Sequence, residues 1–166
     1  MKEIRDAWLV LCGFGFKPAR RHLLLAEDNP LDQSTVKQGL DHAGITNPLH
    51  VVRDGQKVVD YLDGVDEFSD RQRHPLPAVV FLDLNVPLLS CFGVLAWIRQ
   101  RRALTATIVV VLTASEDAGA LCHARSLGAD SFLLTSCNGE ELADQLLEMA
   151  RASNWNWLEG KRFEHV

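Results

Sequence analysis

The chain has 166 residues, 47% of them hydrophobic, and a formal net charge of −5 at pH 7. A chain of this length is long enough for one well-packed domain and short for two, which predicts a single globular domain. The acidic balance, with no basic block beyond the short run 99–103, argues against nucleic acid or an anionic membrane as a partner.

The apolar stretch 7–16 lies close to the start of the chain, behind Lys2 and Arg5. It is too short to span a bilayer, acidic residues interrupt its basic flank, and no cleavage signal for secretion follows it. Apolar residues within 4–11 recur at helical spacing, so residues 1–21 are predicted to be an N-terminal extension with a short amphipathic helix. A start codon assigned in error is the alternative interpretation.

The spacing of cysteine and histidine favours neither a metal site nor a disulfide framework. The four cysteines are widely spaced without a CxxC pair, and the six histidines form no HxxxH or HxH pair. We therefore expect reduced core thiols in a cytoplasmic protein, and histidines with surface or structural roles. The cysteines are Cys12, Cys91, Cys122 and Cys137.

From His22 onward, short apolar runs alternate with helical patterns. The predicted strands are 22–26, 49–52, 78–84, 107–113 and 131–135, and the predicted helices are 30–43, 55–62, 92–100, 116–128 and 140–152. Because each strand is a short apolar run followed by a helix, the pattern predicts an α/β fold whose parallel sheet is covered on both faces.

The first of these helices carries apolar residues that are expected to form one side packed on the sheet. This side is made of Leu31, Thr35, Val36 and Leu40. Further along the chain, the segment 63–77 is polar and contains prolines, so it is expected to be an exposed loop.

Polar residues follow several of the predicted strands at the point where each strand ends. Ligands of doubly wound sheets bind beyond these carboxyl ends. Grouped carboxylates raise one another's pKa or require a cation, and Mg²⁺ prefers oxygen ligands. The pattern therefore predicts a site for Mg²⁺ and a phosphoryl group. Its candidate residues are Glu27, Asp28, Asp83, Thr113 and Thr135.

Four segments resemble the signature segments of response-regulator receiver domains from bacterial two-component signalling. They are LLLAEDNP, VVFLDLNVP, VVVLTAS and LGADSFL, in this order along the chain. The resemblance covers about residues 22–150 and implies a flavodoxin-like, doubly wound, five-stranded parallel sheet with strand order 2-1-3-4-5. It implies a receiver domain at 22–152 and a C-terminal tail at 153–166.

The resemblance also implies roles for individual residues. Asp83 matches the phosphoacceptor, which takes a phosphoryl group from the phosphohistidine of a sensor histidine kinase. Thr113 matches the hydroxyl that hydrogen-bonds the phosphoryl group, and Phe132 stands at the switch aromatic. The implied Mg²⁺ ligands are Glu27, Asp28, Asp83 and the backbone carbonyl of Asn85.

The sequence departs from the family pattern at two places. Thr135 and Ser136 stand where the family has Lys and a cis proline. Thr135 is neutral, so it cannot supply a charge-assisted contact, which is typically worth about 1.5–3 kcal/mol. Ser90 and Cys91 replace the usual Asp-Gly after the acceptor, so that turn must form without its glycine.

Two functions therefore stay open. One is a single-domain receiver that accepts phosphate on Asp83, catalyses nothing beyond its own phosphorylation and dephosphorylation, and signals through protein contacts. The other is a degenerate receiver that acts as an interaction module without phosphorylation. A flavin-binding flavodoxin is disfavoured, because EDNP after the first strand is not the Ser/Thr- and Gly-rich loop that an FMN phosphate requires.

A finer resemblance concerns the loop 63–77, the helix 92–100 and the segment NWNWLEG near the end of the chain. Together they resemble single-domain receivers associated with phytochrome-type sensor kinases. This resemblance implies a phytochrome-type kinase as partner and a homodimer, without an output domain.

Overall fold

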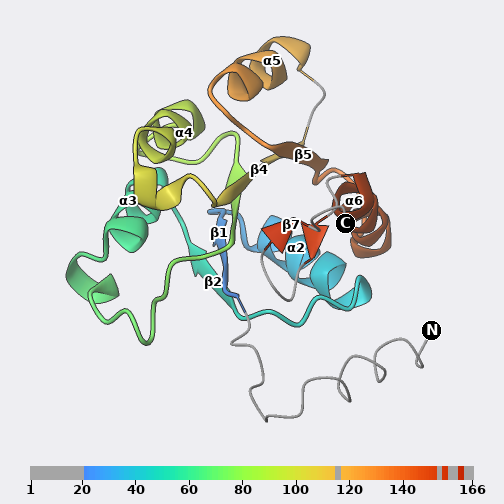
Figure 1. Cartoon of the computed structure of the whole chain (residues 1–166). Coiled ribbons are helices and arrows are strands. Elements are labelled where there is room, and N and C mark those ends of the chain that lie inside the picture. Colours follow the sequence, from blue (N-terminus) through green and yellow to red (C-terminus); the bar gives the residue numbers. More distant parts are fainter. Residues whose placement is uncertain (1–20, 115–116, 153–154, 157–160, 163–166) are drawn as a thin grey trace.

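The structure is a computed structural model that describes residues 21–114, 117–152, 155–156 and 161–162. Its five central strands are parallel and lie in the order β2-β1-β3-β4-β5 (Figure 1). They are Leu23–Ala26 (β1), Leu49–Val52 (β2), Val79–Asp83 (β3), Ile108–Thr113 (β4) and Ser131–Leu134 (β5). The flavodoxin-like fold with strand order 2-1-3-4-5 is confirmed.

Among the described residues, five helices cover the two faces of the sheet (Figure 1). They are Pro30–His42 (α2), Gly55–Asp63 (α3), Cys91–Arg99 (α4), Ala118–Ser126 (α5) and Gly139–Ala152 (α6). One core joins α2 and α6 to the face with Leu23 and Leu25, and the other joins α3, α4 and α5 to the face with Leu24 and Ala26. Successive strand residues point to opposite faces, and since both faces are covered the central strands are apolar almost throughout.

The buried side of α2 differs from the prediction at its first turn. Leu31 is 76% exposed, whereas Gln33, Val36 and Leu40 are buried and Thr35 is half-buried. Leu31 and Leu40 are nine positions apart, about two and a half helical turns, so they point to opposite sides of the helix. The prediction was wrong for Leu31, because the helical period places this residue on the side of α2 that faces away from the sheet.

The segment 63–77 is anchored to the core, although much of it is exposed as predicted. It contains a 3₁₀ turn, Asp66–Phe68 (η1), whose Phe68 is buried and packs on Tyr61. Arg71 donates hydrogen bonds to the carbonyl oxygens of Tyr61 and Leu62 at 2.7 and 2.6 Å. The last carbonyls of a helix need such partners, and Arg71 supplies them for α3. The predicted exposed loop is therefore wrong for Phe68.

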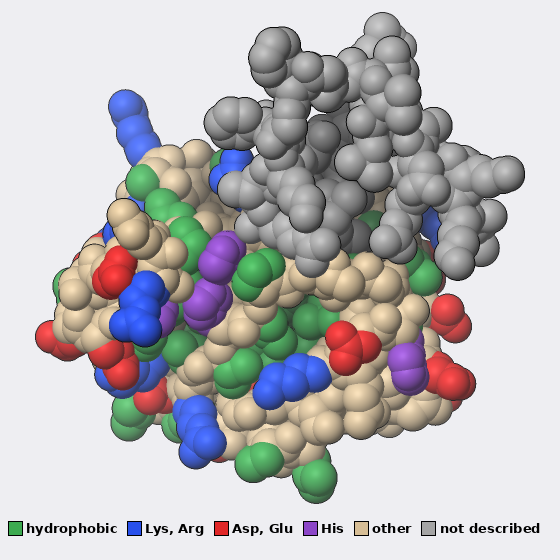
Figure 2. Space-filling model, turned by 90° about the horizontal axis from the view of Figure 1, so that it is seen from below, with side chains coloured by type: hydrophobic (Ala, Val, Ile, Leu, Met, Phe, Trp, Pro, Cys, Tyr) green, Lys and Arg blue, Asp and Glu red, His purple; other side chains and the backbone are tan. Residues whose placement is uncertain are grey.

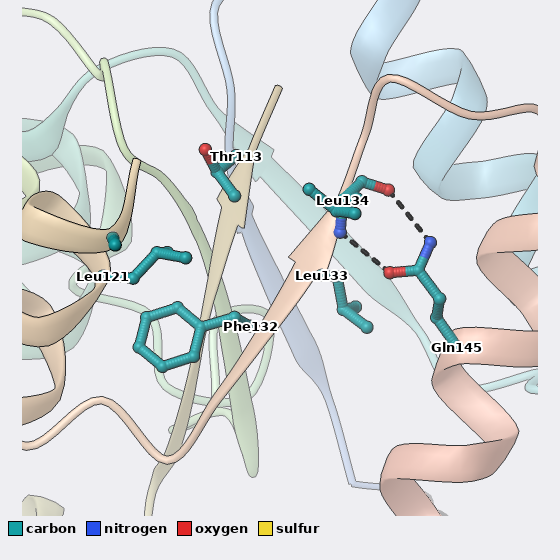
Figure 3. A pocket seen from close by; sticks show the side chains of 7 residues that line it. Thr113, Leu121, Phe132, Leu133, Leu134 and Gln145 are labelled. Atoms are coloured by element: carbon teal, nitrogen blue, oxygen red, sulfur yellow. Dashed lines mark hydrogen bonds between the residues drawn. The ribbon is translucent and has the colours of Figure 1, made fainter. Parts of the chain in front are cut away.

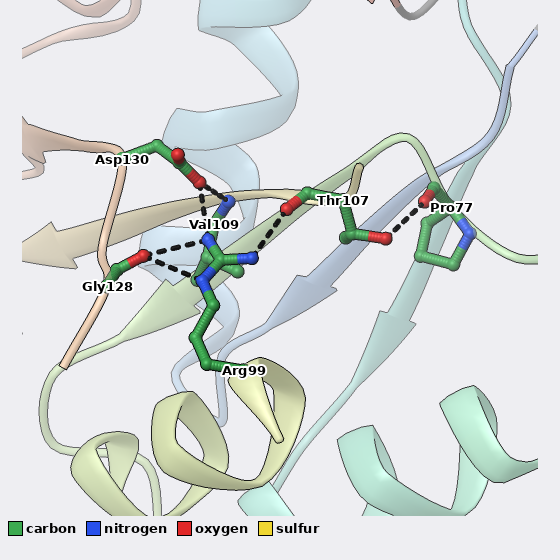
Figure 4. Close-up of polar contacts among 6 residues, drawn as sticks. All are labelled: Pro77, Arg99, Thr107, Val109, Gly128 and Asp130. Atoms are coloured by element: carbon green, nitrogen blue, oxygen red, sulfur yellow. Dashed lines mark hydrogen bonds and ion pairs between the residues drawn. The ribbon is translucent and has the colours of Figure 1, made fainter. Parts of the chain in front are cut away.

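A second arginine connects elements at the amino end of the sheet (Figure 4). Arg99, at the end of α4, donates to the carbonyl oxygen of Gly128 at 3.0 and 2.8 Å and to that of Thr107 at 3.0 Å. It also forms an ion pair with Asp130 at 2.6 Å, and Asp130 accepts a hydrogen bond from the backbone N–H of Val109 at 2.8 Å. The planar guanidinium thus ties α4 to the starts of β4 and β5, away from the predicted site.

The remaining regular elements are short. A 3₁₀ turn spans Arg102–Leu104 (η2), and two antiparallel strands, Trp155–Asn156 (β6) and Lys161–Arg162 (β7), follow α6. The helix predicted within 1–21 lies outside the described residues. In the part of the chain that is described, no helix has the length and apolar character needed to cross a membrane.

The cysteines differ in their surroundings. Cys91 is buried, Cys137 is half-buried and Cys122 is exposed on α5, while Cys12 lies outside the described residues. The three described thiols are free. The prediction of a core thiol was wrong for Cys122, because α5 turns this position away from the sheet.

Candidate functional site

Glu27, Asp83 and Thr113 meet at the carboxyl edge of the sheet because their strands are neighbours. Ala26 pairs with Leu82 in the register of β1 and β3, so Glu27 and Asp83 are the next pair beyond it. Asp83 is itself opposite Leu112 of β4, which leaves Thr113 one step further along that strand. The structure therefore brings these three predicted site residues together.

Asp83 is buried at the end of β3, where it is 9% exposed. Its Oδ2 accepts a hydrogen bond from the backbone N–H of Asn85 at 2.8 Å. Burial is the main cause that raises the pKa of the Asp83 carboxyl above its usual value. Hydrogen bonds from the backbones of Asn85 and Leu84 oppose this rise of the pKa, and the charges of Asp28 and Asp32 add to it. The anion of Asp83 is thus fixed in orientation but weakly solvated.

Glu27 is still more buried, at 3% exposed, and its Oε1 accepts the backbone N–H of Asn29 at 3.0 Å. Burial raises the pKa of Glu27 to about 7, although the hydrogen bond from Asn29 acts in the lowering direction. The charge of Asp83 contributes to the rise. Two neighbouring buried carboxyls with raised pKa values form a place where a cation is stabilising.

The donor set of the site fits a hard divalent cation. Among the residues that the structure describes, no three His, Cys, Asp or Glu side chains already surround one point as metal ligands. Mg²⁺ commonly uses only one or two carboxylates, however, and takes its other oxygens from water and a phosphate. Glu27 and Asp83 can supply those carboxylates, and the exposed Asp28 lies within electrostatic range of both. Ligation by Asp28 and by the Asn85 carbonyl stays a prediction.

In the turn after the acceptor, Leu88 adopts the left-handed conformation that usually favours glycine. Leu88 has φ +65°, a left-handed conformation that costs a non-glycine residue about 1–2 kcal/mol. Its side chain is 84% exposed at the edge of the site. Ser90 then begins α4 as its N-cap, accepting the backbone N–H of Gly93 at 3.2 Å, and Cys91 is buried behind it.

The same turn lies directly against the start of α3. The backbone N–H of Gly55 donates to the carbonyl oxygen of Pro87 at 3.1 Å. A Cβ added at Gly55 would collide with the carbonyl oxygen of Leu89. A glycine is therefore required at this position so that the two backbones can approach.

The corner after β5 is neutral in the structure as in the sequence. Thr135 is 7% exposed, and its backbone N–H donates to the carbonyl oxygen of Thr113 at 2.9 Å. Ser136 is exposed, and none of the described peptide bonds is cis. At these two described positions the chain has neither the cation nor the cis bond of the family pattern.

Phe132 borders a pocket of about 440 Å³ between β4, β5 and α5 (Figure 3). Thr113 and Leu121 also line it, and most of its other lining residues are apolar. The Phe132 ring is half-buried, and the guanidinium carbon of Arg125 lies 5.3 Å from the ring centre. Phe132, the predicted switch residue, thus lines the same pocket as Thr113.

Sequence reasoning missed Asp32, an acidic residue on the first turn of α2. Its Oδ2 accepts a hydrogen bond from Nδ2 of Asn29 at 2.8 Å, and its charge raises the pKa of both Glu27 and Asp83. The spacing of Asn29 and Asp32 resembles a capping box, with a polar N-cap and an acceptor three residues later. That signal was present in EDNPLD and could have directed attention to Asp32.

Known proteins are similar to this chain in sequence and fold. The family described as Response regulator receiver domain matches residues 23–147 of this chain. Response regulator Rcp1 of Synechocystis sp. is 31% identical over 137 residues, which cover 82% of this chain and 88% of Rcp1.

Solved structures agree with this family match. The response regulator RPA3017, described in red light signaling of R. palustris, superposes with a TM-score of 0.74 and 30% identity, covering 81% of this chain and 93% of RPA3017. The Mn²⁺-bound form of Rcp1 superposes with a TM-score of 0.69 and 28% identity, covering 87% of this chain and 99% of Rcp1. The phosphorylated cyanobacterial phytochrome response regulator RcpA superposes with a TM-score of 0.70 and 26% identity, covering 80% of this chain and 93% of RcpA.

Proposed function

This chain belongs to the response regulator receiver domain family, and from that premise we propose that it accepts a phosphoryl group on Asp83. Receivers of this family are signalling modules rather than classical enzymes. The observation that carries the proposal is the pair of buried carboxyls, Glu27 and Asp83, at neighbouring strand ends beside Thr113. The phosphorylated state described for RcpA supports it from a relative.

The donor in this proposal is the phosphohistidine of a sensor histidine kinase. A carboxylate oxygen of Asp83 bonds to phosphorus while the bond from phosphorus to the imidazole nitrogen breaks. The nitrogen keeps the bonding electron pair, and the leaving imidazole takes up a proton from the solvent. The hydrogen bond from Asn85 to Oδ2 holds the Asp83 carboxylate in one orientation. Thr113, one residue beyond the strand partner of Asp83, would donate a hydrogen bond from its hydroxyl to a phosphoryl oxygen.

Mg²⁺ is the cation we infer for this site, with Glu27, Asp28, Asp83 and the backbone carbonyl of Asn85 as the residues that would hold it. When bound, a divalent cation supplies positive charge against the oxygens of the transferring phosphoryl group. The support from this chain is that burial raises the pKa values of Glu27 and Asp83, because poorly solvated carboxylates at one place are stabilised by a cation. The Mn²⁺-bound form of Rcp1 is the support from a relative.

The kinase partner that fits best is of the phytochrome type. RPA3017 is described in red light signaling and RcpA as a phytochrome response regulator, and both share most of their length with this chain. A cytoplasmic location and a homodimer complete the proposal, and these two rest on the family resemblance alone.

A second candidate function is a degenerate receiver that binds partners without being phosphorylated. The observation that favours it is the neutral corner, where Thr135 takes the place of a lysine and forms its backbone contact with Thr113. A missing cation weakens the binding of an anionic phosphoryl group without disturbing the fold.

The test is intact-mass measurement of the purified protein after incubation with Mg²⁺ and acetyl phosphate. We expect one added phosphoryl group in the wild type and none in Asp83→Asn. Asp144→Asn, an exposed aspartate of α6, is the matched control and should be phosphorylated like the wild type. Absence of any adduct, together with no effect of Mg²⁺ on the melting temperature, would favour the interaction module.

A further inference from the structure

Asn29 holds the side chain of Asp32 at the edge of the carboxyl pair. Its side-chain Nδ2 donates to Oδ2 of Asp32 at 2.8 Å, and its Oδ1 accepts the backbone N–H of Leu31 at 3.0 Å. The backbone N–H of Asn29 donates to Oε1 of Glu27 at 3.0 Å. One residue therefore contacts both Asp32 and Glu27 and fixes their positions relative to each other.

Asp32 is joined to Glu27 through Asn29 by hydrogen bonds of 2.8 and 3.0 Å, and Glu27 is next to Asp83 in the sheet register, so the charge of Asp32 lies close to the carboxyl pair. A negative charge within range of both groups also attracts a cation placed between them. The corner at Thr135 adds no positive charge on its side of the site. Asp32 therefore adds to the negative charge that a cation at the carboxyl pair would meet.

We propose that Asp32 is an outer member of the metal site, whose charge strengthens divalent cation binding at Glu27 and Asp83, and that Asn29 is the positioning residue that keeps its carboxylate there. This inference rests on the proposed function, because it names a further residue of the same site. Asp32 acts through its field and does not need to touch the cation.

A purely structural role makes a different prediction. An acidic side chain on the first turn stabilises a helix through the macrodipole, and Asp32 occupies such a position on α2. If that were its whole role, removing the charge would lower the melting temperature of the metal-free protein and leave the affinity for Mg²⁺ unchanged. The affinity for Mg²⁺ is therefore the deciding measurement.

Asp32→Asn is the informative variant, because asparagine keeps an oxygen that can accept the Nδ2 hydrogen bond of Asn29 while the charge is removed. We expect the Kd for Mg²⁺, measured by isothermal titration calorimetry, to rise about three- to tenfold. The difference from wild type should shrink as ionic strength is raised, since salt screens a charge that is not in contact. Asp41→Asn is the control, with the same charge change at the exposed far end of α2, and should bind like wild type.

Asn29→Ser tests the positioning role. Serine can still cap α2, but it has no amide to hold Asp32. We expect weaker Mg²⁺ binding than in wild type, and no further weakening when Asn29→Ser is added to Asp32→Asn, since Asn29 acts through Asp32.

The outcomes separate this inference from the proposed function. Equal Mg²⁺ affinity in wild type and Asp32→Asn, or an equal loss in Asp41→Asn, overturns the role of Asp32 and leaves the phosphoryl site standing. Additive losses in the double variant overturn the positioning role of Asn29. A wild type that binds no Mg²⁺ overturns both the inference and the proposed metal site.

Discussion

The side-chain amide of Gln145 holds both backbone polar groups of Leu134, accepting its N–H at 2.8 Å and donating to its carbonyl oxygen at 3.2 Å (Figure 3). Leu134 ends β5, an edge strand, so these groups point away from β4 and would otherwise lack a strand partner. Cys137 Sγ donates to the same carbonyl at 3.0 Å. The next residue, Thr135, is bound to Thr113 on the other side. The end of β5 is thus fixed from both edges.

Gln145→Leu is expected to loosen this end of β5. Leucine is close in size but offers no hydrogen bond, so the N–H and carbonyl of Leu134 lose a partner, which costs about 1–3 kcal/mol of unfolding free energy. Amide hydrogen exchange at Leu134 and Thr135 should become faster, while exchange in β1 stays slow. Gln56→Leu, on the exposed side of α3, is the control. Unchanged exchange at Leu134 would show that Gln145 does not hold the strand.

Thr135→Lys is expected to speed phosphorylation of Asp83 by acetyl phosphate. A lysine ammonium at this corner would add a charge-assisted contact to the phosphoryl group, and a contact of about 1.5–3 kcal/mol corresponds to roughly a ten- to hundredfold faster reaction. The initial rate of adduct formation measures this effect. Thr135→Met is the control for the larger side chain, since it brings length without charge. Equal rates in the lysine and methionine variants would mean that the missing cation does not limit the reaction.

Much of the fold could be predicted because its signals are local. The strand Val79–Asp83 lies inside an apolar run that ends on an acidic residue, and its predicted limits were one residue too long at each end. The strand order followed from resemblance, since no spacing in the sequence states which strands are neighbours. Once that order is given, parallel strands bring Glu27, Asp83 and Thr113 to one edge.

The features that were missed depend on contacts between distant positions or on orientation. Arg71 caps α3 from the middle of a polar segment, and nothing in the sequence around it marks the carbonyls that it binds. Leu31 is apolar yet exposed, because helical phase and not residue type decides which side is buried. Asp32 was overlooked because it lies outside the motif that carries the resemblance, although its charge reaches the site.

Three of the histidines, His22, His50 and His74, form a group that the sequence spacing did not reveal. Nδ1 of His22 and Nε2 of His50 are 2.7 Å apart, and the two rings are nearly parallel with centroids 5.0 Å apart. The ring of His74 lies 5.6 Å from that of His50, and both contact Tyr61. Figure 2 shows adjoining His side chains on one face of the molecule. This group joins β2 to the start of β1 and to the segment 63–77.

The pKa values of both rings in the hydrogen-bonded pair lie below that of a free histidine, so both rings stay neutral to a lower pH. Burial lowers the pKa of His22, and burial together with the charges that His22 and His74 would carry lowers the pKa of His50. The hydrogen bond between two ring nitrogens also needs one of them unprotonated. Tyr61, with its pKa raised to about 12, stays neutral throughout this range and cannot compensate a second positive charge.

The histidine pair is therefore expected to contribute a loss of stability in mild acid, and His50→Gln should remove part of that contribution. In the unfolded chain these rings titrate at about 6.5, so below this pH they bind more protons in the unfolded state than in the folded state, and their contribution to the free energy of unfolding decreases. Above that pH the pair is neutral in both states and contributes no slope. Urea unfolding from pH 8 to pH 5 measures the effect as the difference between variant and wild type, in which the opposite contribution of Glu27 cancels. His42→Gln, on the exposed end of α2, is the control and should keep the wild-type slope. The same slope in His50→Gln as in wild type would show that the pair is not the acid-sensitive element.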